Sequence, residues 1–265
     1  MSKNRQAIHA CPSLRCPVAT LVYDFARGHI IPPHFHPEDQ LVYASRGVMT
    51  VRTDEGTWVV PPRRAVWIPA KIPHSIVMSG PVSMRTLYLR ARMAHKLPRN
   101  CCVVNVSSLL QELILHACQF PRMHRRSKGH AHLIDLILDQ LQSVKTIPLQ
   151  LPAPLDARAQ CVAKMLRDDS WNTESLATIC RRAGASRRTV ERIFEKETNL
   201  SLGKWRQQLR LLRSLQLLAA GEKITSAALE AGYSTPSAFI AMFRKALGTT
   251  PRRYFAQVEP KFTSR

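Results

Sequence analysis

The sequence predicts two domains: an N-terminal all-β barrel followed by a helical pair, and a C-terminal all-α domain with two helix-turn-helix motifs. Three observations support this fold class. Short runs rich in β-branched and aromatic residues alternate with Gly and Pro up to about residue 92. A stretch with three prolines lies near residue 150, and from residue 156 onward the apolar spacing is helical. The length of 265 residues also suits two domains of ordinary size.

The barrel is predicted over about residues 17–92. Gly and Pro separate short runs of strand-forming residues throughout this segment, and regular punctuation of that kind is typical of a small barrel or sandwich. The expected strands are 20–23, 41–44, 48–52, 57–60, 65–68 and 84–90.

A helical pair over about residues 106–144 completes the first domain, which we place at 1–145. Segments 106–120 and 131–144 carry apolar residues three and four positions apart, and a basic stretch at 122–128 separates them. Such an apolar stripe packs against its own domain or against a second copy of the chain. The pair is therefore predicted to cap the barrel and to be a candidate homodimer surface.

A linker is predicted at residues 146–157. Pro148, Pro152 and Pro154 fall within seven residues and disfavour a helix, so this segment is expected to be an extended connector. The helical domain follows at 158–256.

The chain is strongly basic, with a formal net charge of +21. This balance favours a polyanionic partner such as nucleic acid. Residues 1–157 carry +10 and residues 158–265 carry +11, so charge does not say which domain binds it. No run approaches the roughly 18 apolar residues of a membrane span, and the first thirty residues lack a signal-peptide pattern. We expect a cytoplasmic protein with no membrane partner, whose seven cysteines, free of any C-x-x-C pair, are idle thiols.

The first helix-turn-helix is predicted at residues 176–195, LATICRRAGASRRTVERIFE. Gly184 supplies the left-handed turn and Ser186 is placed to cap the second helix. The small residue where the helices cross is Cys180. The residues expected to face inward are Ile179, Ala183, Val190 and Ile193.

The second motif is predicted at residues 224–243, ITSAALEAGYSTPSAFIAMF. Gly232 is the turn, Thr235 or Ser234 is the cap, and Pro236 fits the first helical turn, where its missing N–H costs nothing. The small residue is Ala228, and the residues expected to face inward are Ala227, Ala231, Ala238 and Ala241. Two such motifs in tandem, each ending in an aromatic residue and a short basic run, argue against a purely structural bundle.

The stretch from about residue 158 to 255 resembles the DNA-binding domain of the AraC/XylS family. The resemblance is carried by SRRTVERIF from Ser186, GKWRQQLRL from Gly203 and GYSTPSAFIAMFRKALGTTPRRYF from Gly232. Within that family the chain looks similar to a cupin-bearing subgroup that includes repressors of efflux-transporter genes. The resemblance implies seven helices, with a long one at about residues 202–219 holding the motifs apart, and two recognition helices that meet one face of double-stranded DNA.

The resemblance also implies which side chains meet the operator. Arginine can bind guanine with a bidentate fork and glutamate can accept from cytosine, whereas the second helix is poor in such groups. The first motif should therefore read most bases, and the second should add thymine-methyl and backbone contacts. The predicted first-helix contacts are Ser186, Arg187, Arg188, Glu191 and Arg192, the second-helix contacts are Thr235, Pro236, Ser237 and Ile240, and the phosphate candidates are Lys196, Arg206, Arg244 and Arg252.

Histidines in the barrel form the second candidate site. The spacing of Gly28, His34, His36, Gln40 and Gly47 resembles the first cupin motif, and the segment from Trp67 to His74 resembles the second. Three imidazoles on neighbouring strands can hold a divalent metal. Gln40 stands where cupin enzymes have glutamate, and a neutral amide is a weaker ligand that cannot act as a general base. His34, His36, Gln40 and His74 are thus expected either to bind a metal, the one cofactor considered, or to line an effector pocket.

Two functions follow. The first, which we favour, is a non-enzymatic, sequence-specific transcription regulator that responds to a small-molecule or metal effector. The resemblance suggests that it controls a gene near its own, which would encode an efflux transporter. The alternative is a metal-dependent cupin enzyme, a dioxygenase or isomerase, with a helical appendage. Gln40 and the tandem motifs both argue against the enzyme. A nonspecific nucleoid protein is a third reading, which would show no preference for an operator over random DNA.

Overall fold

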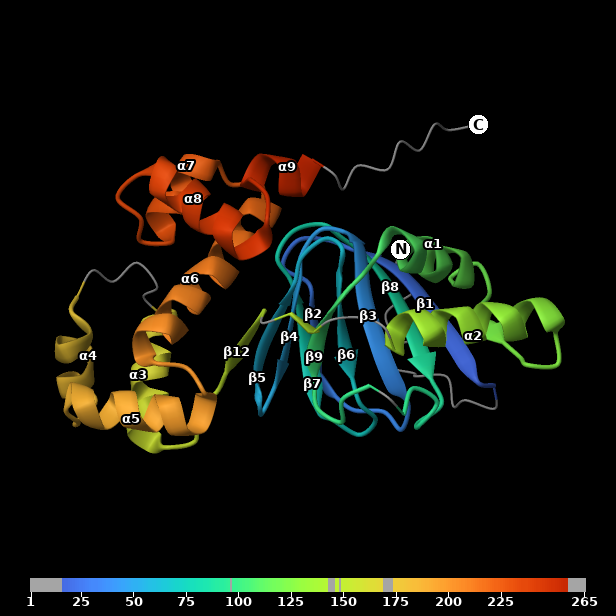
Figure 1. Ribbon diagram of the computed structural model, residues 1–265, viewed down its shortest axis with the longest axis horizontal. Coiled ribbons are helices and arrows are strands. Elements are labelled where there is room, and N and C mark those ends of the chain that lie inside the picture. The colour runs from blue at the N-terminus through green and yellow to red at the C-terminus, as the bar shows by residue number, and fades with distance from the viewer. Residues whose placement is uncertain (1–15, 96, 143–145, 148, 169–173, 257–265) are drawn as a thin grey trace, which may run out of the picture. The chain divides into compact units, whose positions relative to one another are not determined.

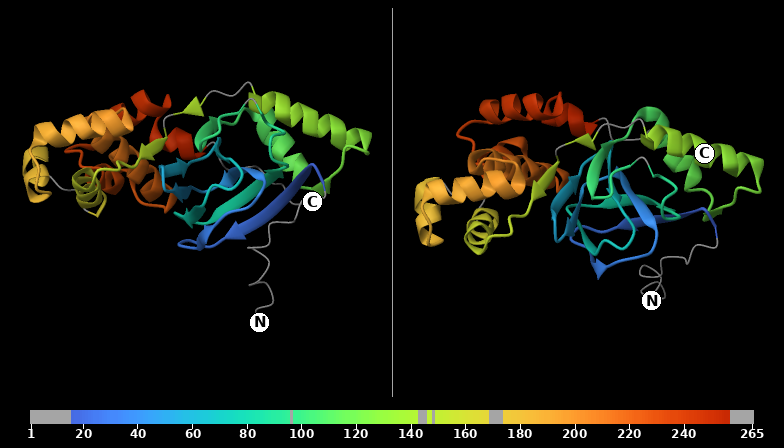
Figure 2. Two further views of the ribbon diagram at one scale, coloured as in Figure 1. Left: turned by 90° about the horizontal axis from the view of Figure 1, so that it is seen from below. Right: turned by 60° about the horizontal axis from the view of Figure 1, so that its bottom comes forward.

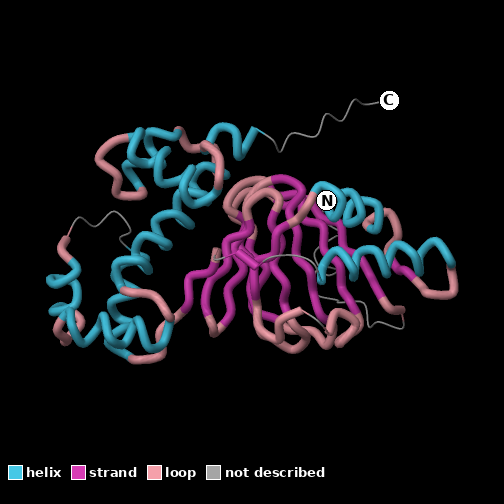
Figure 3. The backbone as a smooth tube through the Cα atoms, viewed as in Figure 1, coloured by secondary structure: helices cyan, strands magenta, loops and turns pink. Residues whose placement is uncertain are grey.

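The computed structural model of the chain describes residues 16–95, 97–142, 146–147, 149–168 and 174–256 (Figure 1). It divides into two compact units, one formed by residues 1–53 and 60–148 and the other by residues 54–59 and 149–265. The first unit is built on β-sheets with two helices, and the second is largely helical, as Figure 3 shows by colour. The predicted fold class is confirmed.

The strands form two sheets in which every recorded pairing is antiparallel. One sheet has the order β10-β1-β8-β3-β6-β9-β11 and the other β12-β5-β4-β7-β2. The strands are β1 (Val18–Phe25), β2 (Ile30–His34), β3 (Asp39–Arg46), β4 (Met49–Thr53), β5 (Gly56–Val60), β6 (Arg64–Ile68), β7 (His74–Met78), β8 (Val82–Leu89), β9 (Cys102–Asn105), β10 (Arg122–Met123), β11 (Thr146–Ile147) and β12 (Gln150–Pro152).

Helices α1 (Ser108–Ala117) and α2 (Lys128–Gln142) cover one face of the larger sheet (Figure 2). Alternate residues of β3 divide between the two faces of the sheet, because side chains along a strand alternate. Leu41 and Tyr43 join the cluster that includes Leu110 of α1 and Ile134 of α2. Burying an aliphatic side chain of this size stabilises the fold by about 1.5–3 kcal/mol. Gln40, Val42 and Ala44, which alternate with these residues and are also buried, belong to the opposite face.

The six predicted strands are all present, and the structure adds strands that the sequence analysis did not propose. The clearest addition is β2, which contains Pro32 and Pro33. Proline usually breaks a ladder, but β2 is an edge strand, where a residue without an N–H is tolerated. The predicted helical pair is also confirmed: α1 is shorter than 106–120, and α2 begins three residues before the predicted 131–144. Residues 143 and 144 lie outside the described part of the chain.

The second unit contains seven helices among its described residues, the number implied by the resemblance. They are α3 (Ala157–Asp168), α4 (Leu176–Arg182), α5 (Arg187–Thr198), α6 (Leu202–Ala219), α7 (Ile224–Glu230), α8 (Pro236–Leu247) and α9 (Pro251–Ala256). The long helix α6 has the predicted bounds. No helix in the described ranges is both long and apolar enough to cross a membrane.

Two described parts of the segment predicted as a linker, 146–157, are strands, so this segment is not a free tether. Thr146 and Ile147 pair with β9, and Gln150–Pro152 pair with β5. Proline favours extended backbone, which is also the conformation that a strand needs, so the composition alone does not separate a tether from a paired strand.

Candidate nucleic-acid interface and barrel histidine site

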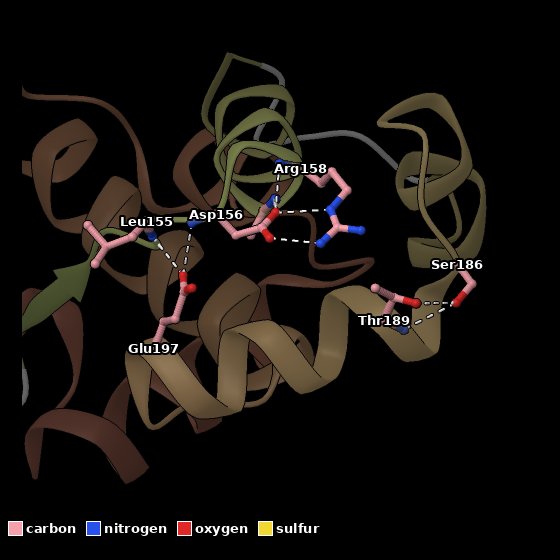
Figure 4. Close-up of polar contacts among 7 residues, drawn as sticks. Leu155, Asp156, Arg158, Ser186, Thr189 and Glu197 are labelled. Carbon is pink, nitrogen blue, oxygen red and sulfur yellow. Dashed lines mark hydrogen bonds and ion pairs between the residues drawn. The ribbon is translucent and has the colours of Figure 1, made fainter.

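The first helix-turn-helix consists of α4 and α5. Gly184 has φ +74°, the left-handed conformation that ends α4. The Ser186 hydroxyl then accepts a hydrogen bond from the backbone N–H of Thr189 at 3.2 Å and caps α5 (Figure 4). Ile179, Cys180, Val190 and Ile193 are buried as predicted, whereas Ala183 is half-buried. Turn, cap and core therefore follow the predicted pattern.

The outer face of α5 presents four exposed cations: Arg187, Arg188, Arg192 and Lys196. Arg187 pairs with the half-buried Glu191, its Nη2 donating to Oε1 at 3.1 Å. These two groups satisfy each other when DNA is absent. Within the described ranges Arg188 and Arg192 form no hydrogen bond or ion pair, so their guanidinium groups are free to bind an anion or a base.

The second helix-turn-helix consists of α7 and α8. Gly232 has φ +73°, Thr235 caps α8 through the backbone N–H of Ala238, and Pro236 occupies the first turn as predicted. The guanidinium of Arg210, on α6, packs against Gly232, where an added Cβ would lie only 2.6 Å from Nη2. Arg210 was not among the predicted residues, because its role depends on the fold of the turn.

The inward face of α8 differs from the prediction. Ala238 and Ala241 are exposed, and Phe239 and Phe243 are buried instead. The reason is the length of the turn: the cap follows Gly184 by two residues but follows Gly232 by three. Counting from the glycines therefore placed the second helix one residue out of register. Counting back from Phe194 and Phe243, each eight residues after its cap, would have given the correct register.

Aligning the two recognition helices at their caps changes which residues correspond. Ser237 matches Arg188 and Ala241 matches Arg192. Ser237 is exposed, and the predicted contacts Pro236 and Ile240 are half-buried. Lys245, which the sequence analysis did not propose, is exposed and matches Lys196. The second helix therefore presents small, uncharged side chains where the first presents arginines.

The predicted phosphate contacts fall into two groups. Lys196, Arg244 and Arg252 are exposed, and their role stays a prediction. Arg206 is half-buried, and its Nη1 donates to the backbone carbonyl of Glu174 at 3.2 Å, just before α4. One of its donors is thus used within the helical unit. The hydroxyls of Ser186 and Thr235 likewise accept the capping hydrogen bonds described above, and the Ser186 hydroxyl also shares a hydrogen bond with that of Thr189 at 2.9 Å.

The structure brings three histidines together: His34 at the end of β2, His36 in the loop between β2 and β3, and His74 at the start of β7. One nitrogen from each ring lies within 4.8 Å of the others. The Nδ1 atoms lie 2.8–2.9 Å from the backbone carbonyls of Pro32, Glu38 and Ile72, respectively, so each Nδ1–H can donate and each Nε2 can keep its lone pair. Three imidazoles oriented in this way are the arrangement that a metal ligand set requires.

His74 is the most distinctive of the three. Its Nε2 is buried and has no hydrogen-bond partner. Burial lowers the pKa of His74 to about 4, against a smaller opposing effect of the Ile72 carbonyl, and the neighbouring His34 and His36 lower it further. The ring is therefore neutral at physiological pH, with an unused lone pair. An unsatisfied polar atom in the interior is costly unless a ligand completes it.

Gln40 lies beside this cluster as predicted. Its Oε1 lies 2.9 Å from Nε2 of the buried His36. Two states fit this contact: a doubly protonated ring donating to Oε1, or a neutral ring accepting from the amide NH₂ after a rotation of the amide. In both states the side chain of Gln40 is hydrogen-bonded to Nε2 of His36, the nitrogen that a metal would need.

Backbone hydrogen bonds fix the loops that carry the histidines. The buried carboxylate of Asp39 accepts from the backbone N–H groups of Ala70 and Arg92 at 2.9 and 3.1 Å. The N–H of Lys71 donates to the carbonyl of His36 at 2.8 Å. These bonds hold the segment before β7 against the one before β3, and the site is therefore preorganised.

Two of the described thiols, Cys102 and Cys118, are poorly reactive. Burial raises the pKa of Cys102 and Cys118 to about 11. A thiol with a raised pKa contains little thiolate at neutral pH and reacts slowly. This agrees with the prediction of idle cysteines for these two residues.

Comparisons with known proteins give the class of this chain. The family model described as AraC-like ligand binding domain matches residues 19–160, and the one described as helix-turn-helix domain matches residues 179–257. The chain is 33% identical over 227 residues to the HTH-type transcriptional regulator NimR of Escherichia coli strain K12, covering 86% of this chain and 83% of the relative. It is 25% identical to the virulence regulon transcriptional activator VirF of Yersinia enterocolitica, covering 81% and 79%. Among solved structures, ToxT from Vibrio cholerae covers 90% of this chain and 94% of its own, with 12% identity and a TM-score of 0.38.

The chain belongs to the AraC/XylS family of transcription regulators. It is therefore a DNA-binding regulator with an N-terminal ligand-binding domain, and this class of protein is not enzymatic. The alternative of a metal-dependent cupin enzyme is set aside.

Proposed function

We propose that this regulator recognises a specific operator mainly through α5, and that a ligand bound at the barrel histidines changes its DNA binding. The observation that carries the proposal is the contrast between the recognition helices. Arg188 and Arg192 are exposed and unpaired within the described chain, whereas the matching residues of α8 are Ser237 and Ala241. Bidentate arginine contacts to guanine discriminate bases strongly, whereas a serine hydroxyl can bond to either base type and an alanine methyl contacts at most a thymine methyl.

The remaining charged groups of α5 support this assignment. Glu191 can accept from cytosine once Arg187 exchanges its carboxylate partner for DNA. The exposed cations Lys196, Lys245, Arg244 and Arg252 are suited to phosphates, which position a protein on the duplex without reading its sequence. Ser186, Thr235, Pro236, Ser237 and Ile240 would then complete the two helix N-termini that approach the grooves.

In the barrel, His34, His36 and His74 fit a divalent metal once the amide of Gln40 moves away from Nε2 of His36. All three donors are imidazole nitrogens, a set that suits zinc, nickel, copper or iron better than magnesium or calcium. The orphaned Nε2 of His74 supports an added ligand at this place. A bound ion would supply a fixed positive charge and an electrophilic position for an organic effector. The same nitrogens could instead bind the effector directly by hydrogen bonds, with Gln40 released from His36.

The wider setting extends this proposal. We expect a cytoplasmic homodimer that regulates an adjacent efflux-transporter gene, as the subgroup resemblance suggests. Leu109 of α1 and Leu136 of α2 are large apolar residues that remain exposed, which supports the helical pair as the dimer surface.

The test is a gel-shift titration of the full chain with DNA upstream of its own gene and with random DNA of equal length, at a stated salt concentration. We expect at least one upstream fragment to bind far more tightly than random DNA, and the addition of zinc or nickel to change its affinity. Equal affinity for all fragments would reduce the protein to a nonspecific DNA binder. A specific shift that no metal alters would favour an organic effector.

A further inference from the structure

The end of the linker is fastened to the first recognition helix. We call residues 150–156 the linker strap. Glu197 lies in the last turn of α5, and its Oε2 accepts from the backbone N–H of Leu155 at 2.7 Å and of Asp156 at 3.1 Å (Figure 4). A carboxylate that accepts two N–H groups makes charge-assisted bonds, which are stronger than neutral ones.

A second contact reaches α5 through Trp205 of α6. The indole Nε1 of Trp205 donates to the carbonyl of Pro152 in the strap at 2.9 Å. The Trp205 ring is fully buried and packs edge-on against Phe194 of α5, with ring centroids 5.4 Å apart. The strap thus contacts the last turn of α5 directly through Glu197, and it contacts the buried face of α5 indirectly through Trp205.

The other edge of the strap pairs with β5. Gln150, Leu151 and Pro152 pair with Trp58, Thr57 and Gly56. The N–H of Ala153 also donates to the carbonyl of Glu55 at 3.1 Å. Gly56 allows the close approach, since a Cβ there would lie 2.6 Å from the Leu151 carbonyl oxygen. In the chain, β5 follows β4 after two residues, so β5 continues directly from the ligand-binding part of the sequence.

We propose that the linker strap sets the position of the recognition helix α5, with Glu197 as the positioning residue, and that β5 acts on α5 through the strap. With a free tether, the position of the DNA-binding helices would not depend on the state of the preceding domain. A strap held on both edges ties the placement of Arg188 and Arg192 to β5, which is the kind of contiguous element that carries coupling. The proposal rests on the proposed role of α5 as the reader of the operator.

The experiment measures the affinity of the full chain for its operator and for random DNA in matched pairs of variants. Glu197→Ala and Glu195→Ala each remove one exposed carboxylate from α5, but only Glu197 touches the strap. Both changes remove negative charge and should tighten random-DNA binding equally. We expect Glu197→Ala alone to lower the operator-to-random ratio, by roughly three- to tenfold. Glu197→Gln keeps an acceptor oxygen and should restore part of that loss.

A second pair tests the β5 edge. Gly56→Ala pushes a Cβ into the strap backbone, whereas an added Cβ at Gly129, in α2, meets nothing within 4 Å. We expect Gly56→Ala to lower the same ratio and Gly129→Ala to leave it unchanged. Amide hydrogen exchange at Leu155 and Asp156 should be faster in Glu197→Ala than in Glu195→Ala, which reports the strap without using DNA.

The outcomes separate the two ideas. Suppose that both variants are folded and that amide exchange at Leu155 is faster in Glu197→Ala. Equal operator-to-random affinity ratios for Glu197→Ala and Glu195→Ala would then overturn the positioning role, while α5 would remain the helix that reads the operator. Equal ratios for Gly56→Ala and Gly129→Ala would overturn the action of β5. An operator-to-random ratio of one in the unaltered protein would overturn the proposed function itself.

Discussion

At the scale of single residues, Arg188 has the features of a base-reading side chain. It lies two residues after the Ser186 cap, is exposed, and has no partner in the described chain. We predict that Arg188→Ala weakens operator binding by roughly 1–3 kcal/mol and relaxes the preference at one base pair. Titrations with single-base operator variants measure both effects. Lys196→Ala is the control, and it should weaken operator and random DNA alike. An equal loss on both DNAs for Arg188→Ala would identify a phosphate contact instead.

His74 provides a prediction for the barrel. His74→Leu keeps a similar volume but removes the unpartnered Nε2, so metal-free stability should change by no more than about 1 kcal/mol, the orphaned atom and the lost Nδ1–H bond roughly offsetting each other. Zinc or nickel should raise the melting temperature of the unaltered protein and not that of His74→Leu. The exposed His132, replaced by Ala, controls for adventitious binding. An undiminished metal response in His74→Leu would exclude this site.

These residue-level roles differ in how far the sequence could predict them. The likeness of the histidine spacing to the two cupin motifs predicted that the three imidazoles lie near one another, and the structure places them so. Sequence spacing could not show that Gln40 contacts His36, or that Glu191 pairs with Arg187, because those contacts depend on rotamers. Glu197 gave no signal at all, since its partners are backbone N–H groups of a segment about forty residues earlier.

At the scale of elements, the two helix-turn-helix turns look alike but differ in what surrounds them. Gly184 and Gly232 have nearly the same positive φ, yet only Gly232 faces a side chain, the guanidinium of Arg210. We predict that Gly184→Ala costs about 1–2 kcal/mol of unfolding free energy, the price of a Cβ in left-handed backbone. Gly232→Ala should cost more, because Arg210 must also move. Urea unfolding measures both.

A double substitution isolates that extra cost. In an Arg210→Ala background the Gly232→Ala penalty should fall to that of Gly184→Ala, because residues in contact are not additive. Equal penalties for the two glycines in the unaltered background would show that Arg210 moves aside freely.

The elements also show where pattern reading stops. The family resemblance implied a long helix at about residues 202–219, and α6 has these bounds, with Ser201 capping its first turn. The register of α8 was missed by one residue, since turn length has no fixed sequence signature beyond the glycine. Strand β12 was missed because prolines suit a tether and an edge strand equally.

At the scale of the whole molecule, net charge and sequence recognition are separate properties. Both halves of the chain carry almost the same excess of positive charge, yet the residues suited to base reading are gathered on α5. Electrostatic attraction to phosphates is independent of sequence and depends steeply on salt. The cations outside α5 should therefore support random-DNA binding when the reading residues are gone.

This separation gives the last prediction. A variant with Arg187, Arg188 and Arg192 replaced by Ala loses three of 39 basic residues. It should lose its operator preference but keep random-DNA affinity within roughly tenfold at about 50 mM salt, with both affinities falling as salt approaches about 200 mM. Fluorescence anisotropy across that salt range measures the two affinities and their slopes. For random DNA, the slope of log affinity against log salt concentration should decrease by no more than the equivalent of about three phosphate contacts. Complete loss of random-DNA binding would show instead that α5 supplies the electrostatic attachment as well as the reading.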